Sequence, residues 1–232
     1  MTHISTVFFD LDDTLFNHTA ANQLAVSRFK KQYFPDVLPE KFNQIWREKT
    51  RKNWQLFMAN KLSFEEQRTQ RIIELWQVLL GQKINTTTAR AIFQEFLAYY
   101  EESWAPLPNV HQVFQQLVAQ KIAIGIITNG GEKQQRKKIK TVGLLPFLTP
   151  SLILISEVVG IAKPNAAIFQ HAQQLAKVRP EHILIVGNDF TLDIEPAQRL
   201  GWQTLLIDHV TQPVTNSPEL VLERVLTYLH SV

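Results

Sequence analysis

Three aspartates lie within four positions near the start of the chain, in the stretch FFDLDDTLF of residues 8–16. Asp10, Asp12 and Asp13 follow directly after an apolar run that ends at Phe9. Neighbouring carboxylates repel one another and raise each other's pKa unless a cation or hydrogen-bond donors neutralise them. The cluster therefore indicates a site rather than a scaffold, provided that the rest of the chain supplies the neutralising charge.

A second acidic group stands in the same relation to another apolar run. Asp189 and Asp193 follow the run at 183–186, so five of the seven aspartates fall in these two stretches. If the two runs are neighbouring parallel strands, the carboxylates converge at the strands' carboxyl ends, where open α/β sheets bind ligands. Oxygen ligands in a chain without cysteine favour Mg²⁺ as the cation.

Polar residues also follow two further apolar runs. Thr128 and Asn129 come directly after the run at 122–127 and offer hydroxyl and amide donors that suit the oxygens of an anion. Lys163 comes after the run at 152–155 and would supply a positive charge for a phosphate or for the aspartate cluster.

The elements that must position these residues follow from the apolar pattern. The runs are nearly continuous, as in parallel strands that are buried on both faces. They occupy residues 4–9, 122–127, 152–155, 183–186 and 204–207. Helical periodicity fills the gaps between them at 110–118, 132–142, 165–176, 193–200 and 218–230. This alternation predicts an α/β fold with a doubly wound parallel sheet.

The first gap departs from this alternation. About a hundred residues between Phe16 and Ile122 contain no convincing strand, and helical stripes run through 20–34, 40–58, 63–80 and 86–100. We therefore predict a helical domain at residues 17–105, inserted into a catalytic core of residues 1–16 and 106–232.

The composition of the chain limits the classes of partner and site that we expect. The 24 basic and 21 acidic residues give a net charge of +3, which does not call for nucleic acid. Residues 132–140 carry five basic residues, but they lack interleaved aromatics, so we interpret them as the exposed face of a helix. Without cysteine no disulfide or thiolate site exists. No apolar stretch approaches the roughly 20 residues of a membrane span, so no membrane partner and a cytoplasmic location are expected.

Four motifs resemble a known family when taken in order. DLDDTL at 10–15, ITNG at 127–130, Lys163 before a proline and VGNDFTLD at 186–193 resemble the haloacid dehalogenase (HAD) superfamily of phosphohydrolases. The resemblance covers essentially the whole chain. The phrases GLLPFL and ISEVVGIAKPNAAIF are similar to the branch with pyrimidine 5'-nucleotidases, acylneuraminate phosphatases and phosphoglycolate phosphatases. The helical insert is similar to that branch's cap domain, so the resemblance implies a HAD-like core with a cap.

The resemblance also implies catalytic roles. Asp10 would attack phosphorus and form an aspartyl-phosphate. Asp12 would protonate the leaving alkoxide and then deprotonate the hydrolytic water. Thr128 and Asn129 would hold phosphate oxygens, and Lys163 would stabilise the charge on the nucleophile and the phosphoryl group. Asp13 is expected to be a solvated or capping residue.

The metal site departs from the family pattern at one position. The resemblance places Mg²⁺ on Asp10, the main-chain carbonyl of Asp12 and the acidic loop after residue 186. The family usually has aspartate directly after the glycine of that loop, but here Gly187 is followed by Asn188 and then Asp189. Either Asn188 or Asp189 would ligate the metal. Asp193 fits the second acid of the motif, usually a supporting contact.

These expectations add up to a Mg²⁺-dependent phosphomonoester hydrolase for a small phosphorylated metabolite, either a nucleoside monophosphate or a sugar phosphate. A phosphomutase keeps the same catalytic set and is one alternative. A dehalogenase is another, although such enzymes generally lack an acid at the position of Asp12. The third alternative is a degenerate, non-enzymatic binding or regulatory member, motivated by Asn188 and the basic helix.

Overall fold

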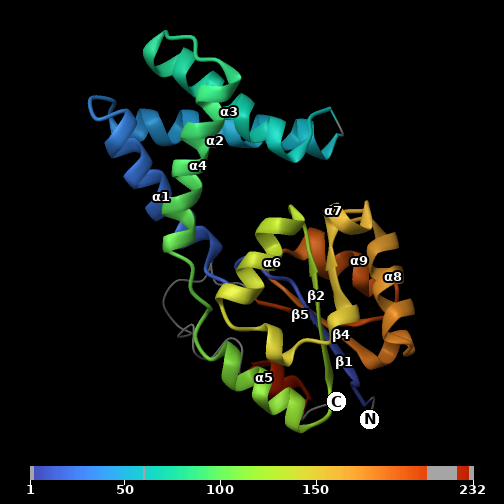
Figure 1. Cartoon of the computed structure of the whole chain (residues 1–232). Coiled ribbons are helices and arrows are strands. Elements are labelled where there is room, and N and C mark those ends of the chain that lie inside the picture. The colour runs from blue at the N-terminus through green and yellow to red at the C-terminus, as the bar shows by residue number, and fades with distance from the viewer. Residues whose placement is uncertain (1–2, 60, 208–223, 230–232) are drawn as a thin grey trace. The chain divides into compact units, whose positions relative to one another are not determined.

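The computed structural model describes residues 3–59, 61–207 and 224–229. Contacts within the chain divide it into two compact units. The first, here the core unit, comprises Met1–Thr19 and Trp104–Val232, and the second, the helical unit, comprises Ala20–Ser103. Figure 1 labels most of the elements of both units.

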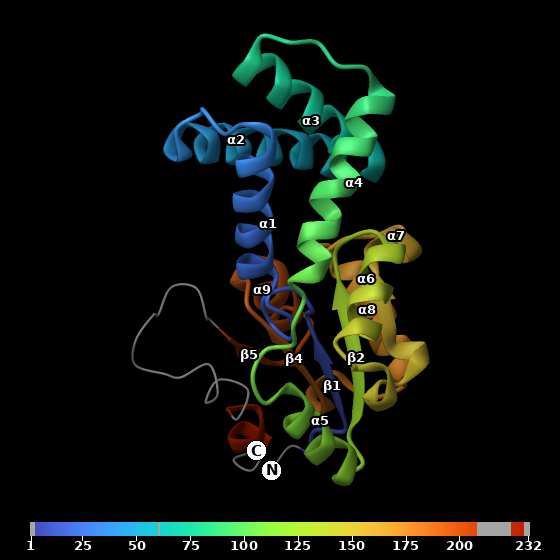
Figure 2. The same cartoon turned by 60° about the vertical axis from the view of Figure 1, so that its left-hand side comes forward.

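A five-stranded parallel sheet forms the centre of the core unit, and its strand order is β3-β2-β1-β4-β5. Figure 2 shows β5, β4, β1 and β2 side by side. The strands are β1 (Thr6–Phe9), β2 (Ala123–Thr128), β3 (Ile153–Ile155), β4 (Ile183–Gly187) and β5 (Gln203–Leu206). Each predicted apolar run matches one strand to within two residues at either end. The doubly wound parallel sheet is thus confirmed, and β1 lies between β2 and β4.

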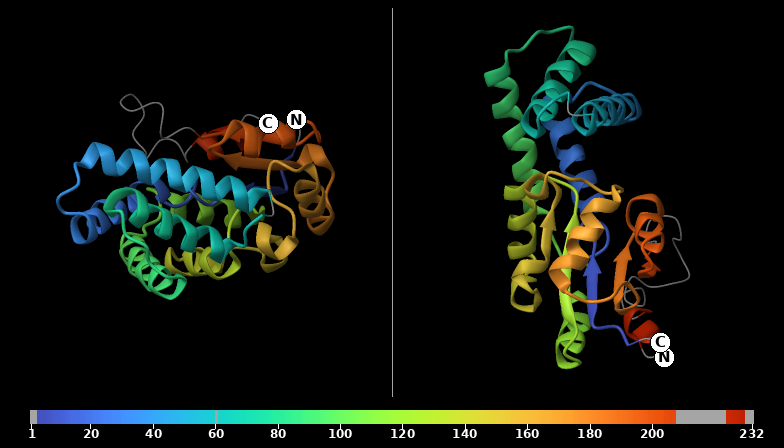
Figure 3. Two further views of the ribbon diagram at one scale, coloured as in Figure 1. Left: turned by 90° about the horizontal axis from the view of Figure 1, so that it is seen from above. Right: turned by 90° about the vertical axis from the view of Figure 1, so that its right-hand side faces the viewer.

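Helices cover both faces of this sheet (Figure 3). On one face lie α5 (Val110–Ala119) and α6 (Glu132–Thr141), and on the other α8 (Ala166–Ala176) and α9 (Glu195–Gln198). Successive β1 side chains point to opposite faces because a strand is pleated. Phe9 packs on Phe114 of α5 with ring centroids 5.0 Å apart, whereas Phe8 stacks on Trp202 at 5.5 Å. A one-turn helix, α7 (Ser156–Val159), follows β3.

One predicted helix differs in its local form. In place of a helix at 193–200, the chain forms a π-helical turn at Phe190–Ile194 that continues into α9. The Asp189 carboxylate accepts from the N–H groups of Thr191 and Leu192, which starts the turn earlier than the apolar periodicity indicates. Of the helix predicted at 218–230, residues 224–229 are helical and the remainder lies outside the described residues.

The helical unit consists of α1 (His18–Tyr33), α2 (Pro39–Met58), α3 (Phe64–Leu80) and α4 (Thr86–Glu102). The predicted helices agree with these bounds to within two residues. Ser63 and Glu66 form a capping box at the start of α3, and Asn85 caps α4. The core is aromatic, since the Phe29 ring contacts five others: Tyr33, Phe34, Trp46, Trp76 and Phe96.

Among the described residues, no helix has the length and apolar character that crossing a bilayer requires.

Candidate active site

The loop after β1 folds back on itself and places its aspartates in different environments. The Leu11 carbonyl accepts from the N–H groups of Leu15 and Phe16. Asp13 adopts a left-handed conformation with φ of 60°, which Asp tolerates better than most residues. Its carboxylate accepts from the N–H of Thr19 at 2.7 Å and from the Thr19 hydroxyl at 2.5 Å. Asp13 thus caps the first turn at residue 19, which is one of the two roles expected for it.

Asp10 lies in a buried triad with Lys163 and Asp193. The Lys163 Nζ donates to Asp10 Oδ1 at 2.7 Å and to Asp193 Oδ1 at 2.6 Å. The three residues are 6%, 2% and 1% exposed for Asp10, Lys163 and Asp193 respectively. One ammonium faces two carboxylates, so the triad carries an excess negative charge when both acids are ionised. A buried charge of this kind requires a proton or a cation.

The pKa shifts within the triad reflect this excess of negative charge. Burial raises the pKa of Asp10 to about 7, against the opposing charge of Lys163, while Asp193 and Asp12 add to the rise. Burial alone would lower the pKa of Lys163, but the charges of Asp10 and Asp193 outweigh it and raise this pKa above its ordinary value. Lys163 therefore stays protonated, and a cation bound beside Asp10 would lower the raised pKa of this carboxyl.

Asp193 sits directly against the end of β4. Its Oδ2 accepts from the main-chain N–H of Asp189 at 3.1 Å. A Cβ added at Gly187 would lie 2.4 Å from Asp193 Oδ2 and 2.5 Å from Asp193 Cβ. Only glycine at 187 therefore permits the short Asp193 side chain to reach Lys163.

We expect Gly187→Ala to lower the free energy of unfolding by about 1–3 kcal/mol, because the new methyl group overlaps a buried side chain that has no room to move. Urea unfolding measures the change. Gly160→Ala is the matched control, because Gly160 has a φ of +74° but open space around it, so that variant reports backbone strain alone. A Gly187→Ala protein as stable as wild type would contradict the steric explanation.

Two side chains of helix α6 bind the Asp12 carboxylate. Its Oδ1 accepts from the Lys138 Nζ at 2.6 Å and its Oδ2 from the Gln135 Nε2 at 3.0 Å, both from α6. The His18 Nδ1 lies 3.8 Å from Asp12 Oδ1. Burial acts to raise the pKa of Asp12, but Lys138, His18 and the hydrogen bonds outweigh it, and the pKa is lowered. The pKa of Asp10 is thus raised and that of Asp12 lowered, although only one residue separates them.

Thr128, the last residue of β2, and Asn129 after it contact both aspartate groups indirectly. The Thr128 Oγ1 accepts from Gln135 Nε2 at 2.7 Å. The Asn129 side chain pairs with the main chain of Lys163: its Nδ2 donates to the Lys163 carbonyl, and its Oδ1 accepts from the Lys163 N–H, each at 2.9 Å. The amide assigned to phosphate by resemblance therefore fixes the segment that carries Lys163.

In the loop after β4, the two residues considered as metal ligands, Asn188 and Asp189, make different contacts. The Thr14 hydroxyl lies 3.1 Å from Asp10 Oδ2 and 3.4 Å from Asn188 Oδ1, so these two oxygens flank one small group. Asp189 instead uses its Oδ1 to cap the π-helical turn. Within the part of the chain that the structure describes, no three or more His, Cys, Asp or Glu side chains are grouped to hold a metal ion. A cation near Asp10 would therefore rely on amide and main-chain oxygens as well.

Two residues of this site were not predicted from the sequence, and the expected exposed basic face at 132–140 fails at one of its five basic residues, since the other four are exposed. Lys138, 2% exposed, does not belong to an exposed basic face of 132–140, and Gln135 beside it is 1% exposed. The signal lies in the helical spacing. Counting back four residues from the buried apolar Ile139 and Val142 gives 135 and 138, which places both on the inward face.

Comparison with known proteins assigns the family. Residues 4–201 match the haloacid dehalogenase-like hydrolases. The chain belongs to this family. The resemblance drawn from the four motifs is thus confirmed. Each of those motifs, at the end of a strand or in the loop beyond it, supplies one part of the site described above.

Three relatives extend over most of this HAD-like hydrolase. The putative HAD-hydrolase YfnB of Bacillus subtilis is 26% identical, covering 95% of this chain and 90% of its own. The glyceraldehyde 3-phosphate phosphatase of Methanothermobacter thermautotrophicus is 26% identical, covering 88% and 86%. The pyrimidine 5'-nucleotidase YjjG of Escherichia coli is 27% identical, covering 91% and 90%. A crystal structure of YfnB bound to magnesium matches with a TM-score of 0.74 at 24% identity, covering 98% of this chain and 99% of that one, which shows a shared fold.

Proposed function

We propose that this HAD-like hydrolase is a Mg²⁺-dependent phosphomonoesterase that acts through an aspartyl-phosphate on Asp10. The observation that supports the proposal most strongly is that two neighbouring carboxylates are each bound by a different lysine. Asp10 is bound by Lys163 and Asp12 by Lys138, each through a contact of 2.6–2.7 Å. A nucleophile and a proton-transfer group are thereby kept distinct within one loop.

The proposed reaction has two steps. Asp10 attacks phosphorus as the ionised carboxylate, and the ester P–O bond breaks. Asp12, whose pKa Lys138 lowers, must take up a proton before this step and gives it to the leaving alkoxide. Asp12 then takes a proton from a water molecule that attacks the aspartyl-phosphate. The acyl phosphate P–O bond breaks, which releases inorganic phosphate and restores the Asp10 carboxylate.

Phosphate binding is proposed for three residues. The Thr128 hydroxyl oxygen already accepts from Gln135, so its own proton is suited to a phosphate oxygen. Lys163 offers an ammonium beside the nucleophile. Asn129 would contribute its main-chain N–H, since its side chain binds the Lys163 main chain.

The oxygens around Asp10 fit Mg²⁺, and the excess negative charge of the triad gives a cation a reason to bind. We propose that the Asp10 carboxylate, the main-chain carbonyl of Asp12 and the Asn188 side-chain oxygen would hold it, with Asp189 and Asp193 in supporting positions. When bound, Mg²⁺ neutralises charge on the phosphoryl group. An amide in place of the usual carboxylate predicts weaker Mg²⁺ binding than is typical for the family.

The proposed substrates are nucleoside monophosphates and small sugar phosphates. The support comes from the names of relatives, which include pyrimidine 5'-nucleotidases and glyceraldehyde 3-phosphate phosphatases at 24–27% identity over most of the chain.

The test is phosphate release from a panel of nucleoside monophosphates, triose and hexose phosphates and phosphoglycolate. We expect one class to be hydrolysed in Mg²⁺. EDTA should lower its rate by about 100-fold or more, because charge neutralisation contributes several kcal/mol to phosphoryl transfer. Restoration by added Mg²⁺ is the control. A folded protein that releases no phosphate from any compound would contradict the proposal and favour a mutase or a binding protein.

A further inference from the structure

Helix α6 directs two buried polar side chains at one carboxylate. Gln135 and Lys138 lie one helical turn apart, and both are at least 98% buried. Each donates to a different oxygen of Asp12, Lys138 to Oδ1 at 2.6 Å and Gln135 to Oδ2 at 3.0 Å. A carboxylate that is bound at both oxygens from a rigid helix has a fixed orientation.

Gln135 also connects this carboxylate to the proposed phosphate-binding residue. Its Nε2 lies 2.7 Å from Thr128 Oγ1 and 3.3 Å from the Asn129 carbonyl oxygen. Gly130 makes room for it. A Cβ at 130 would lie 3.1 Å from Gln135 Cδ, and the φ of +147° is one that favours glycine. The chain after β2 is thus shaped around the Gln135 amide.

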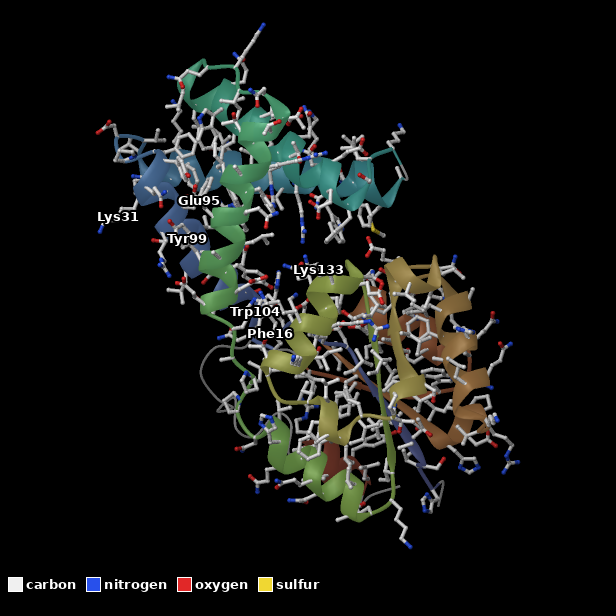
Figure 4. All side chains as sticks on the ribbon, viewed as in Figure 1. Phe16, Lys31, Glu95, Tyr99, Trp104 and Lys133 are labelled. Carbon is white, nitrogen blue, oxygen red and sulfur yellow. The ribbon has the colours of Figure 1, made fainter. Side chains whose placement is uncertain are left out.

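Stability alone does not explain these contacts. Replacing a buried ion pair by apolar residues of similar volume is often neutral or stabilising. The Lys138 ammonium also lies 5.1 Å from the centroid of the Phe16 ring, which packs edge-on against Trp104 (Figure 4). An apolar residue at 138 would suit that aromatic environment. A lysine there is better explained by what it does to Asp12.

We propose that Gln135 and Lys138 are positioning residues that orient the Asp12 carboxylate, beside the phosphate held at Thr128, for proton transfer to the leaving alkoxide and from the hydrolytic water. The inference rests on the proposed function. It predicts that loss of either side chain slows the steps in which Asp12 moves a proton more than a step that needs no proton.

Two esters separate these steps under single-turnover conditions, with enzyme in excess. p-Nitrophenolate leaves without a proton, whereas the alkoxide of an alkyl phosphate requires one from Asp12. In Lys138→Met and Gln135→Leu, cleavage of the alkyl ester should slow by about 100-fold, within the usual range for general acid catalysis. Release of p-nitrophenol by Lys138→Met should stay within about 3-fold of wild type, because nucleophilic attack by Asp10 does not use Asp12. Gln135→Leu also loses its contact with Thr128, so it should slow p-nitrophenol release as well, but less than cleavage of the alkyl ester.

Three further comparisons complete the design. Lys138→Arg keeps the donor and should restore most of the alkyl ester rate. Lys140→Met is the matched control from the exposed side of the same helix and should leave both rates unchanged. In an Asp12→Asn background, Lys138→Met should cause no further loss, because a positioning residue acts only through the group it positions.

Equal slowing of both esters, or an additive loss in the Asp12→Asn background, would overturn the inference. If wild type cleaves neither ester, the proposed function fails by itself. Crystal structures of Lys138→Met and Gln135→Leu then decide the positioning role: an Asp12 carboxylate rotated away from Thr128 supports it, and an unmoved one overturns it.

Discussion

Asp10→Asn is expected to lower Mg²⁺-dependent phosphate release by about 10⁴-fold or more, the size of loss seen when a nucleophile is removed. Asparagine has nearly the same shape, and its amide oxygen can still accept from Lys163 while its Nδ2 donates to the Thr14 hydroxyl oxygen, but an amide does not attack phosphorus. Phosphate release from the best substrate of the panel measures the effect. Acid quenching should trap a phosphorylated protein with wild type and none with the variant.

A measurement of stability distinguishes the loss of phosphate release in Asp10→Asn from misfolding. The pKa of Asp10 is raised to about 7 by burial, so its ionised form weakens the folded state above that pH. A neutral asparagine removes the excess charge, and Asp10→Asn in EDTA should be at least as stable as wild type at pH 8. Asp13→Asn is the matched control in the same loop. It loses part of its contact with Thr19 but should retain turnover. Substantial phosphate release by Asp10→Asn would contradict a nucleophilic role.

The sequence was most informative where local rules determine the structure. Continuous apolar runs specify strands that are buried on both faces, and polar residues at their carboxyl ends therefore meet at one edge of the sheet. Asp10, Thr128 and the loop after β4 could be placed together for that reason. The caps at Ser63 and Asn85 likewise depend on side chains a few residues from the main chain they bind.

Contacts between motifs could not be predicted in the same way. The pairing of Asn129 with the Lys163 main chain joins residues 34 positions apart and depends on the packing of two loops. Lys138 was misplaced because a basic segment usually lies in solvent, whereas here a carboxylate 126 positions away compensates its burial. Asp189 was considered as a metal ligand, yet its Oδ1 caps a π-helical turn that periodicity does not reveal.

Lys163→Met should separate the electrostatic role of the lysine from its packing. Removing one partner of a buried ion pair leaves an uncompensated charge, so the free energy of unfolding in EDTA should fall by about 3 kcal/mol at pH 8. The difference in the free energy of unfolding between the variant and wild type should be smaller at pH 5. Without the lysine the pKa of Asp10 rises further above its unfolded value near 3.8. The folded variant therefore binds a proton more tightly than the unfolded chain and loses stability as pH rises.

Urea unfolding in EDTA between pH 5 and 8 measures this dependence, and Lys163→Met/Asp193→Asn is the matched control. The double variant removes one of the two carboxylates, so it should recover much of the stability at pH 8. It should not recover turnover, which falls by about 100-fold to 1,000-fold because no ammonium stabilises the phosphoryl charge. A deficit that is the same at every pH would mean that Lys163 acts through packing alone. Recovery of stability without recovery of turnover would show that the same charge has two separate roles, holding the acids together and assisting phosphoryl transfer.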